Sequence, residues 1–173
     1  MSEDSPEELV KKERPGAAIN DKQVVEILGR NRLVNELLRA GLEVARPERD
    51  HGVDLIVYAD RTPRTSAFVA RPLQMKAAME RSFVLEAKYR PFPNLLLVYV
   101  WRLADPAEAV TYAMDYNQAL SIAETMRWLE TKSWVEDGIY AVPTPSRKLV
   151  GLLEPYIMTP ERWWERLLEG VSA

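Results

Sequence analysis

Residues 41–60 read GLEVARPERDHGVDLIVYAD, and this stretch decides the fold. The apolar run at residues 55–58 is typical of a buried β-strand, yet Asp54 stands immediately before it. A carboxylate is costly to bury unless a partner compensates its charge. The position of Asp54 therefore requires a nearby cation or hydrogen-bond donor, which makes this residue the first candidate for a functional role.

A second strand is predicted at residues 66–77, SAFVARPLQMKA, after the hairpin loop DRTPRT at residues 60–65. Gln74 and Lys76 are two residues apart, so they point to the same face of this strand. Antiparallel pairing across the loop places the start of one strand beside the end of the other. We therefore expect Asp54 to lie close to Gln74 and Lys76 at one end of a sheet.

The remaining patterns alternate between helix and strand. Residues 21–40 form an amphipathic helix with Asn20 as its N-cap and Gly41 at its end, and Pro72 predicts a bulge or a locally unpaired edge in the second hairpin strand. Residues 82–90 fit either a short strand or a helical turn. The other elements are predicted as strands at 42–47, 94–101, 110–116 and 137–143, and as helices at 118–129 with Asn117 as cap, at 147–154 after Ser146, and at 160–169 between Thr159 and Gly170.

This order of elements predicts an α/β or α+β fold with a mixed sheet flanked by helices, and α/β is the class that we expect. Residues 1–18 are expected to form a flexible arm, and residues 19–173 a single domain, which suits a chain of 173 residues. Trp163 and Trp164 are adjacent, so on a helix they point about 100° apart. Both are buried only if that helix is deeply embedded or forms an interface, and a homodimer is the interpretation that follows from the second case.

The composition excludes several classes of site. There is no cysteine, which rules out disulfides, thiolate nucleophiles and zinc–thiolate centres. No glycine-rich nucleotide-binding motif occurs. No apolar run approaches the roughly 20 residues that span a bilayer, and the polar start of the chain is unlike a secretory signal. We therefore expect a cytoplasmic protein without membrane contact.

The formal net charge of −3 predicts no overall basic surface for phosphates. Basic residues nevertheless outnumber acidic ones between residues 61 and 90, so a local patch would have to serve any contact with nucleic acid. The arginines predicted to contribute to such contacts are Arg30, Arg32, Arg71 and Arg81. The alternative is that each of them is an ordinary solvated surface charge.

The convergence at the end of the hairpin suits a hard divalent cation. Asp54 offers a carboxylate, Gln74 an amide oxygen and Met75 a backbone carbonyl, and Mg²⁺ or Mn²⁺ takes such oxygen ligands while it keeps several waters. Lys76 would orient or help to deprotonate a water and would neutralise charge on a phosphate. The structural alternative is that Asp54 accepts hydrogen bonds from a turn or forms an ion pair with Lys76.

Residues 20–101 resemble the PD-(D/E)xK nuclease superfamily, which includes many restriction endonucleases and the archaeal Holliday-junction resolvases. The resemblance rests on the amphipathic helix, on the segment GLEVARPERDHGVDLI and on the later QMK. Asp54 matches the family's Asp, and Gln74-Met75-Lys76 matches its third element in the QxK variant. The resemblance implies a restriction-endonuclease-like core and Mg²⁺-dependent hydrolysis of phosphodiester bonds in nucleic acid, with DNA as the first expectation.

The acidic companions of Asp54 depart from the family pattern. Many members carry a glutamate on the first helix, but the nearest acids here, Glu26 and Glu36, do not fit its spacing, and Asp50 is a further acid close in sequence. Together with the glutamine at position 74, this favours an alternative in which a degenerate nuclease fold binds nucleic acid or a protein partner without cutting. A third hypothesis is an interaction protein with no role in nucleic-acid chemistry.

Overall fold

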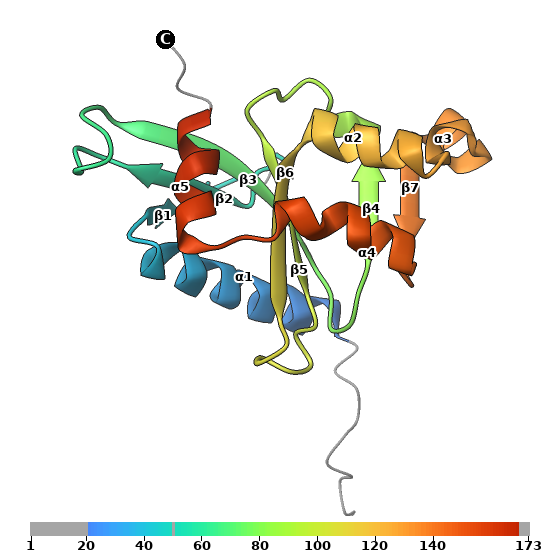
Figure 1. The fold of residues 1–173 in the computed structure, drawn as a ribbon, viewed down its shortest axis with the longest axis horizontal. Helices are drawn as coiled ribbons and strands as arrows, with labels where there is room; N and C mark the ends of the chain where they lie inside the picture. Colours follow the sequence, from blue (N-terminus) through green and yellow to red (C-terminus); the bar gives the residue numbers. More distant parts are fainter. Residues whose placement is uncertain (1–20, 50, 170–173) are drawn as a thin grey trace, which may run out of the picture.

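The computed structural model describes residues 21–49 and 51–169, which form helices packed around a twisted sheet (Figure 1). The strands are β1 Glu43–Ala45, β2 Leu55–Ala59, β3 Val69–Ala77, β4 Phe83–Glu86, β5 Leu96–Trp101, β6 Val110–Asp115 and β7 Ile139–Val142. The α-helices are α1 Lys22–Arg39, α2 Tyr116–Thr125, α3 Lys132–Asp137, α4 Arg147–Leu153 and α5 Pro160–Leu168, and the 3₁₀ turns are η1 Ala87–Tyr89, η2 Trp128–Glu130 and η3 Glu154–Tyr156. The predicted arm at residues 1–18 lies outside the described residues. The N-cap of α1 is Asp21, whose side chain accepts from the N–H of Gln23 at 2.9 Å, and not the predicted Asn20, which is also outside them.

Five strands form one mixed sheet in the order β1-β2-β3-β5-β6, and β4 pairs with β7 in a separate ribbon. The first three strands are an antiparallel meander, β5 runs parallel to β3, and β6 returns antiparallel to β5. The predicted α/β class with a mixed sheet flanked by helices is confirmed. Strand β3 is the centre of the sheet, and its last residues reach the end where the candidate site lies.

Pro72 lies where β3 has only one neighbour. It pairs with Ile56 of β2 in an unbroken register, while the parallel pairing of β3 with β5 starts one residue later, at Leu73. A missing N–H is tolerated on the side of a strand that has no partner. The predicted unpaired edge is therefore confirmed, and the alternative of a bulge is not what the chain adopts.

Two apolar cores lie on opposite faces of the sheet. Alternate residues of β5 point to each: Leu96, Val98 and Val100 join α1 and α5, whereas Leu97, Tyr99 and Trp101 join β4, α2 and α4. All six residues of β5 are buried, as the continuous apolar run at residues 94–101 predicts. Figure 1 shows α1 and α5 beside β1–β3, with α2, α3 and β7 gathered at the other end of the molecule.

Several local predictions hold, and others need correction. Gly41, with φ +79°, ends α1, Thr159 caps α5, and Ser146 caps α4. The helix predicted at 118–129 instead begins at Tyr116, because Asp115 and not Asn117 is the N-cap and forms a capping box with Gln118. It ends at Thr125, and the backbone then turns at Arg127, whose φ is +61°. The predictions omit α3 altogether.

Residues 82–90 contain both of the structures that their sequence allows. Strand β4 ends at Glu86, and η1 follows at once over Ala87–Tyr89. These residues form the connection between the parallel strands β3 and β5. Side chains of this connection therefore lie over the end of β3, close to Gln74 and Lys76.

The two adjacent tryptophans are buried inside one chain. Trp163 is 0% and Trp164 6% exposed, and their Nε1 atoms donate to Glu36 Oε1 and to the carbonyl of Ala40, each at 2.8 Å. Helix α5 is thus deeply embedded against α1, so the burial of both residues requires no second subunit, and a homodimer stays a prediction. Within the described ranges, no helix is long and apolar enough to cross a bilayer.

Candidate functional site

Strands β2 and β3 bring Asp54 beside Gln74, as the counting of register predicts. Leu55 and Leu73 are the last pair of the β2–β3 ladder, and the N–H of Asp54 donates to the Leu73 carbonyl at 2.9 Å, which places Asp54 next to Gln74. The Nε2 of Gln74 and the backbone N–H of Met75 both donate to Asp54 Oδ2, each at 2.6 Å. Two donors on one oxygen compensate the carboxylate and hold it in a single orientation.

The side-chain amide of Gln74 is buried, and its orientation follows from its neighbours. Its Nε2 lies between Asp54 Oδ2 and the Met75 carbonyl, which is 3.3 Å away, and the reverse orientation would turn Oε1 toward two other acceptors. With this orientation Oε1 is buried and accepts no hydrogen bond from the described residues. A buried acceptor without a partner costs about 1–3 kcal/mol, so the oxygen points to a donor or cation that the described residues do not supply.

Lys76 extends from the same face of β3 and pairs with Glu86 at the end of β4. The distance from Lys76 Nζ to Glu86 Oε1 is 2.6 Å, and Lys88 Nζ lies 2.6 Å from Oε2 of the same carboxylate. The hydroxyl of Tyr89 donates to Oε1 at 3.4 Å. The prediction from sequence did not assign Glu86 to the site; the only signal for it was the EAK segment at residues 86–88, which places an acid and a base on the same side of an extended chain.

These contacts set the ionisation of the Lys76–Glu86 pair. Burial by itself would lower the pKa of Lys76, but the hydrogen bond to Glu86 and the electrostatic attraction of Tyr89 and Glu86 together outweigh it and raise that pKa above its ordinary value. Burial would likewise raise the pKa of Glu86, but the hydrogen bonds from Lys76 and Lys88 lower it overall. At neutral pH Lys76 is therefore an ammonium ion and Glu86 a carboxylate, so a role of Lys76 as a base that deprotonates water is not supported.

A polar cavity of about 480 Å³ opens at this end of the sheet. It is lined by His51, Gly52, Gln74, Lys76, Lys88, Tyr89 and Phe92. The volume lies within the range of roughly 300–1,000 Å³ that is usual for small-ligand sites. The lining offers cations, an amide and an aromatic ring, which is a set of groups suited to an anionic ligand with a planar part.

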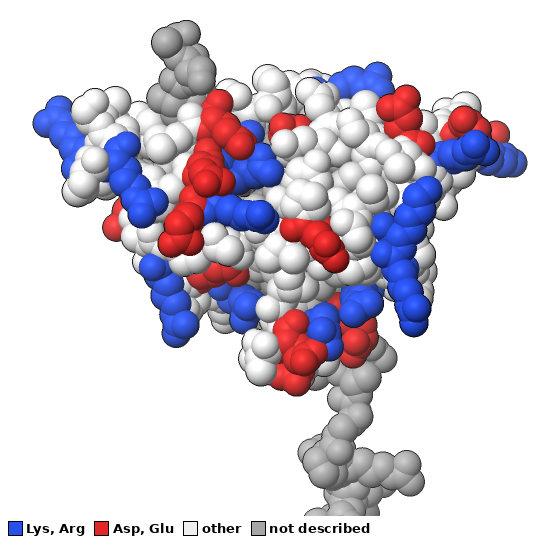
Figure 2. All heavy atoms as spheres, in the orientation of Figure 1, with Lys and Arg blue, Asp and Glu red and all other residues white. Residues whose placement is uncertain are grey.

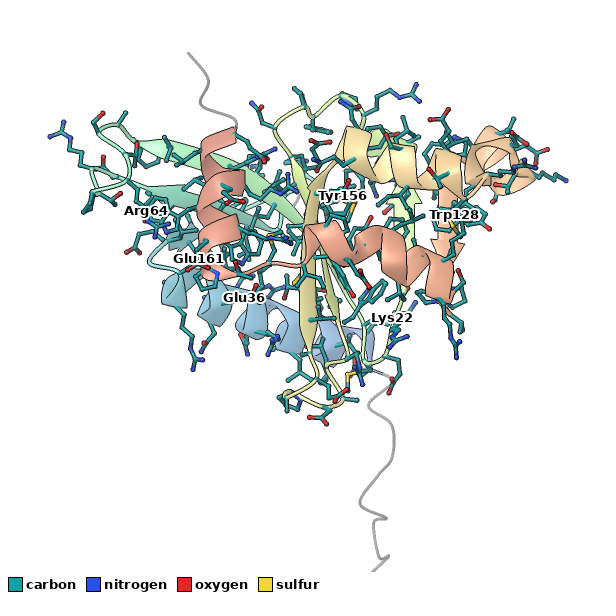
Figure 3. All side chains as sticks on the ribbon, in the orientation of Figure 1. Lys22, Glu36, Arg64, Trp128, Tyr156 and Glu161 are labelled. Atoms are coloured by element: carbon teal, nitrogen blue, oxygen red, sulfur yellow. The ribbon has the colours of Figure 1, made fainter. Side chains whose placement is uncertain are left out.

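The two candidate acids of α1 have different surroundings. Glu36 accepts hydrogen bonds from Thr111 Oγ1 and Trp163 Nε1, each at 2.8 Å, between α1, β6 and α5 (Figure 3). It is therefore a structural carboxylate away from Asp54. Glu26 lines a second cavity, of about 470 Å³, together with Lys76, and it forms an ion pair with Arg30 on the next turn of the helix. Of the two helix acids, only Glu26 shares a cavity with Lys76.

The four arginines that were predicted to contact nucleic acid lie in different surroundings. Arg71 is 5% exposed and donates to the carbonyls of Asn94 and Arg166, so its burial removes it from the predicted binding surface. Arg32 donates to two carbonyls of the β5–β6 loop, and Arg30 pairs with Glu26. Arg81 is exposed.

The surface charges also give little support for a basic binding area. Acidic and basic side chains are interspersed on the face drawn in Figure 2, without an extended basic area there. The net charge of −3 agrees with this mixed pattern. Long-range attraction of a polyanion is therefore weak, and recognition has to come from local contacts.

The oxygen atoms of the described residues do not by themselves complete the coordination of a metal ion at the site. In the part of the chain that the structure describes, no group of three His, Cys, Asp or Glu side chains is placed to hold a metal ion; Asp50 lies outside that part. The Asp54 carboxylate, the orphaned Gln74 Oε1 and the Met75 carbonyl remain as oxygen donors. Such a set suits Mg²⁺, which keeps waters and takes further oxygens from a substrate phosphate, and does not suit an ion that needs a complete protein cage.

Comparisons with known proteins give no match for this chain. No protein-family model matches it, and neither a curated protein nor a solved structure does. The function is therefore argued from the residues and contacts of the site.

Proposed function

We propose that the protein is a Mg²⁺-dependent nuclease that hydrolyses phosphodiester bonds of nucleic acid, with Asp54, Gln74 and Lys76 as its central residues. One observation carries the proposal: the buried Gln74 Oε1 has no partner among the described residues, and it lies beside a fixed carboxylate and next to a cavity that also contains Lys76. An orphaned oxygen of this kind is a reason to expect a ligand.

The residues divide the chemical work as follows. Asp54 and Gln74 would hold the ion, with the Met75 carbonyl nearby, and the ion when bound would supply Lewis acidity and a water of lowered pKa. Lys76, kept protonated by Glu86, stabilises the negative charge that develops on the phosphate. Glu86 fixes the position of the ammonium group, so it acts as a positioning residue.

The topology supports the proposal. A helix, a β-hairpin that carries the acid and the QxK element, a crossover helix and a further strand are the core that the resemblance to PD-(D/E)xK nucleases implies, and α1, β2–β3 and β5 follow the order of its helix, hairpin and further strand. One feature differs: the connection from β3 to β5 contains β4 and η1 where the family has a helix. This difference is what brings Glu86, Lys88 and Tyr89 to the site.

A second candidate function is binding of nucleic acid without cleavage. It is favoured by the small number of carboxylates, because Glu86 is occupied by two lysines and Asp54 by two donors. DNA as the substrate and a cytoplasmic location stay predictions.

Cleavage assays with labelled DNA and RNA, single-stranded and duplex, test the proposal. We expect cleavage with Mg²⁺ or Mn²⁺ and none in EDTA. Asp54→Asn and Lys76→Met should each lower the rate by roughly 100-fold or more. Lys132→Met is the matched control, because Lys132 is 83% exposed on α3 and should leave the rate unchanged.

The same assays separate the two candidates. Cleavage that persists unchanged in Asp54→Asn would place the activity elsewhere. Binding to the same oligonucleotides in EDTA, without cleavage when either metal is added, would replace the nuclease by the binding function.

A further inference from the structure

Phe92 is a rigidly held aromatic residue at the mouth of the candidate site. It is 43% exposed and stands between Pro91 and Pro93. Its N–H donates to the Tyr89 carbonyl at 3.1 Å, and its own carbonyl accepts from the N–H of Leu95 at 3.1 Å. Two prolines and two turn hydrogen bonds restrict the backbone of this loop, so the point at which the ring is attached is fixed beside the cavity.

The ring of Phe92 is open, whereas the neighbouring ring of Tyr89 is not. Tyr89 is buried, and Lys76 and Lys88 lie 5.5 Å and 5.0 Å from its ring centroid. Tyr89 therefore forms a wall of the cavity. Phe92 is in none of the aromatic pairs formed by the described residues, and it is 43% exposed beside a cavity that Lys76 and Lys88 also line.

The charge of the site suits a short nucleic-acid contact. Lys88 has a 61% exposed side chain beside the cavity, and Lys76 lies deeper in it. Two lysines are few for a duplex, which is usually held through an extended row of phosphate contacts. A single strand needs fewer ionic contacts, because aromatic stacking of an unpaired base adds affinity that is independent of salt bridges.

We propose that the cavity receives one unpaired nucleotide, with its base stacked on Phe92 and its phosphate beside Lys88, so that the substrate class is single-stranded or locally unpaired nucleic acid. This inference rests on the proposed function for its chemistry, because it names the substrate of the same site. A base that is paired within a duplex keeps its faces stacked on its neighbours and cannot use the Phe92 ring.

The test measures binding in EDTA, where cleavage cannot interfere. Fluorescence anisotropy compares labelled oligothymidylate with an oligonucleotide of the same length that has abasic sites in place of thymines, and with a blunt duplex. We expect the wild type to bind oligothymidylate best. Phe92→Ala should weaken that binding by about tenfold to a hundredfold and leave binding to the abasic strand unchanged.

Two further variants identify stacking as the cause. Phe92→Trp should retain the affinity, whereas Phe92→Leu, which keeps apolar bulk but no aromatic face, should behave like Phe92→Ala. Phe68→Ala is the matched control: Phe68 is 61% exposed on the β2–β3 hairpin, does not line the cavity, and should bind like the wild type. Thermal melting confirms that the variants are folded, and oligouridylate in parallel shows whether the sugar matters.

The outcomes separate this inference from the nuclease proposal. Equal binding of thymidylate, abasic strand and duplex, or full affinity in Phe92→Leu, would overturn the stacking of an unpaired base. Stacking-dependent binding together with no cleavage in any metal would keep this inference and remove the nuclease activity. Cleavage of duplex in preference to single strand would keep the nuclease and overturn the substrate class.

Discussion

The Nζ atom of Lys76 lies 2.6 Å from Oε1 of Glu86, which ties the central strand β3 to the end of β4 beside the candidate site. The second oxygen of Glu86 takes Lys88 at the same distance of 2.6 Å. The carboxylate is thereby satisfied on both sides and is only 9% exposed. Lys76 is held as a charged group, and both folding and phosphate chemistry are expected to depend on this contact.

The first prediction concerns the pH dependence of stability. Folding lowers the pKa of Glu86 below its ordinary value of 4.5, because the hydrogen bonds from Lys76 and Lys88 outweigh its burial. The stabilisation is therefore present above pH 4.5 and lost as the pH falls through the lowered pKa. Urea unfolding of wild type and Glu86→Gln should differ most at neutral pH and converge in acid.

The pKa of Lys76 predicts that stability also falls at alkaline pH. The pKa of Lys76 is raised above its ordinary value of 10.5, so its stabilisation is present below that pH and is lost as the pH rises through the raised value. Lys76→Met should therefore differ from the wild type by a constant amount from neutral pH up to 10.5. A difference between Glu86→Gln and wild type that is the same in acid and at neutral pH would contradict the ion pair.

The second prediction concerns the contact of α1 with β3. A Cβ added at Gly29 would lie 2.5 Å from Ala77 Cβ, so Gly29→Ala should push the helix from the strand and lower the free energy of unfolding by about 1–3 kcal/mol. Gly151→Ala in α4 is the control, because a Cβ there meets nothing within 4 Å. It should raise stability by roughly 0.5–1 kcal/mol. Equal effects of the two substitutions would refute the close approach.

The third prediction concerns Asp54 as an acceptor. Asp54→Ala removes the oxygen that takes Gln74 Nε2 and the Met75 N–H, and should lower the free energy of unfolding by about 1–3 kcal/mol. Asp54→Asn retains one carbonyl oxygen and should lose less. Asp60→Ala, at the exposed end of the same strand, should change stability little. Chemical denaturation of the three variants measures their free energies of unfolding. An Asp54→Ala variant as stable as the wild type would contradict the role of Asp54 as an acceptor.

The fourth prediction separates the two acids of α1. Glu36→Gln disturbs hydrogen bonds to Thr111 and Trp163 and should destabilise the protein by roughly 1–3 kcal/mol. Under the proposed function, the folded Glu36→Gln variant should cleave at the wild-type rate. Glu26→Gln should leave stability nearly unchanged, because its pair with Arg30 is on the surface. We expect it to lower cleavage by about 10- to 100-fold, because Glu26 lines the cavity of Lys76. Thermal melting and cleavage rates of both variants test this prediction. A slower Glu36→Gln together with an unchanged rate in Glu26→Gln would exclude Glu26 from the site.

Several elements of the fold could be predicted from the sequence because they depend on residues that are close together in the chain. The helix before Gly41, the hairpin strands around residues 60–65 and the buried run of β5 depend on periodicity and turn residues, which neighbours in sequence determine. The proximity of Asp54 and Gln74 also belongs here, because hairpin pairing sets the register once the loop is known. By contrast, the cap at Asp115 was missed, since several polar residues near a helix start can serve equally well.

Only the tertiary structure decided which charged groups meet. Glu86 reaches Lys76 because the connection from β3 to β5 leaves the sheet as β4 and passes over its end, which no local pattern encodes. Arg71 is buried because α5 returns across the hairpin and supplies the carbonyl of Arg166. Residue spacing along the chain determines faces and ends of elements, whereas partners for buried charges are chosen by packing between segments far apart in sequence. The sequence alone therefore determined that Asp54 lies beside Gln74 and that Lys76 shares a strand face with Gln74, whereas the packing determined the partner and the charge state of Lys76.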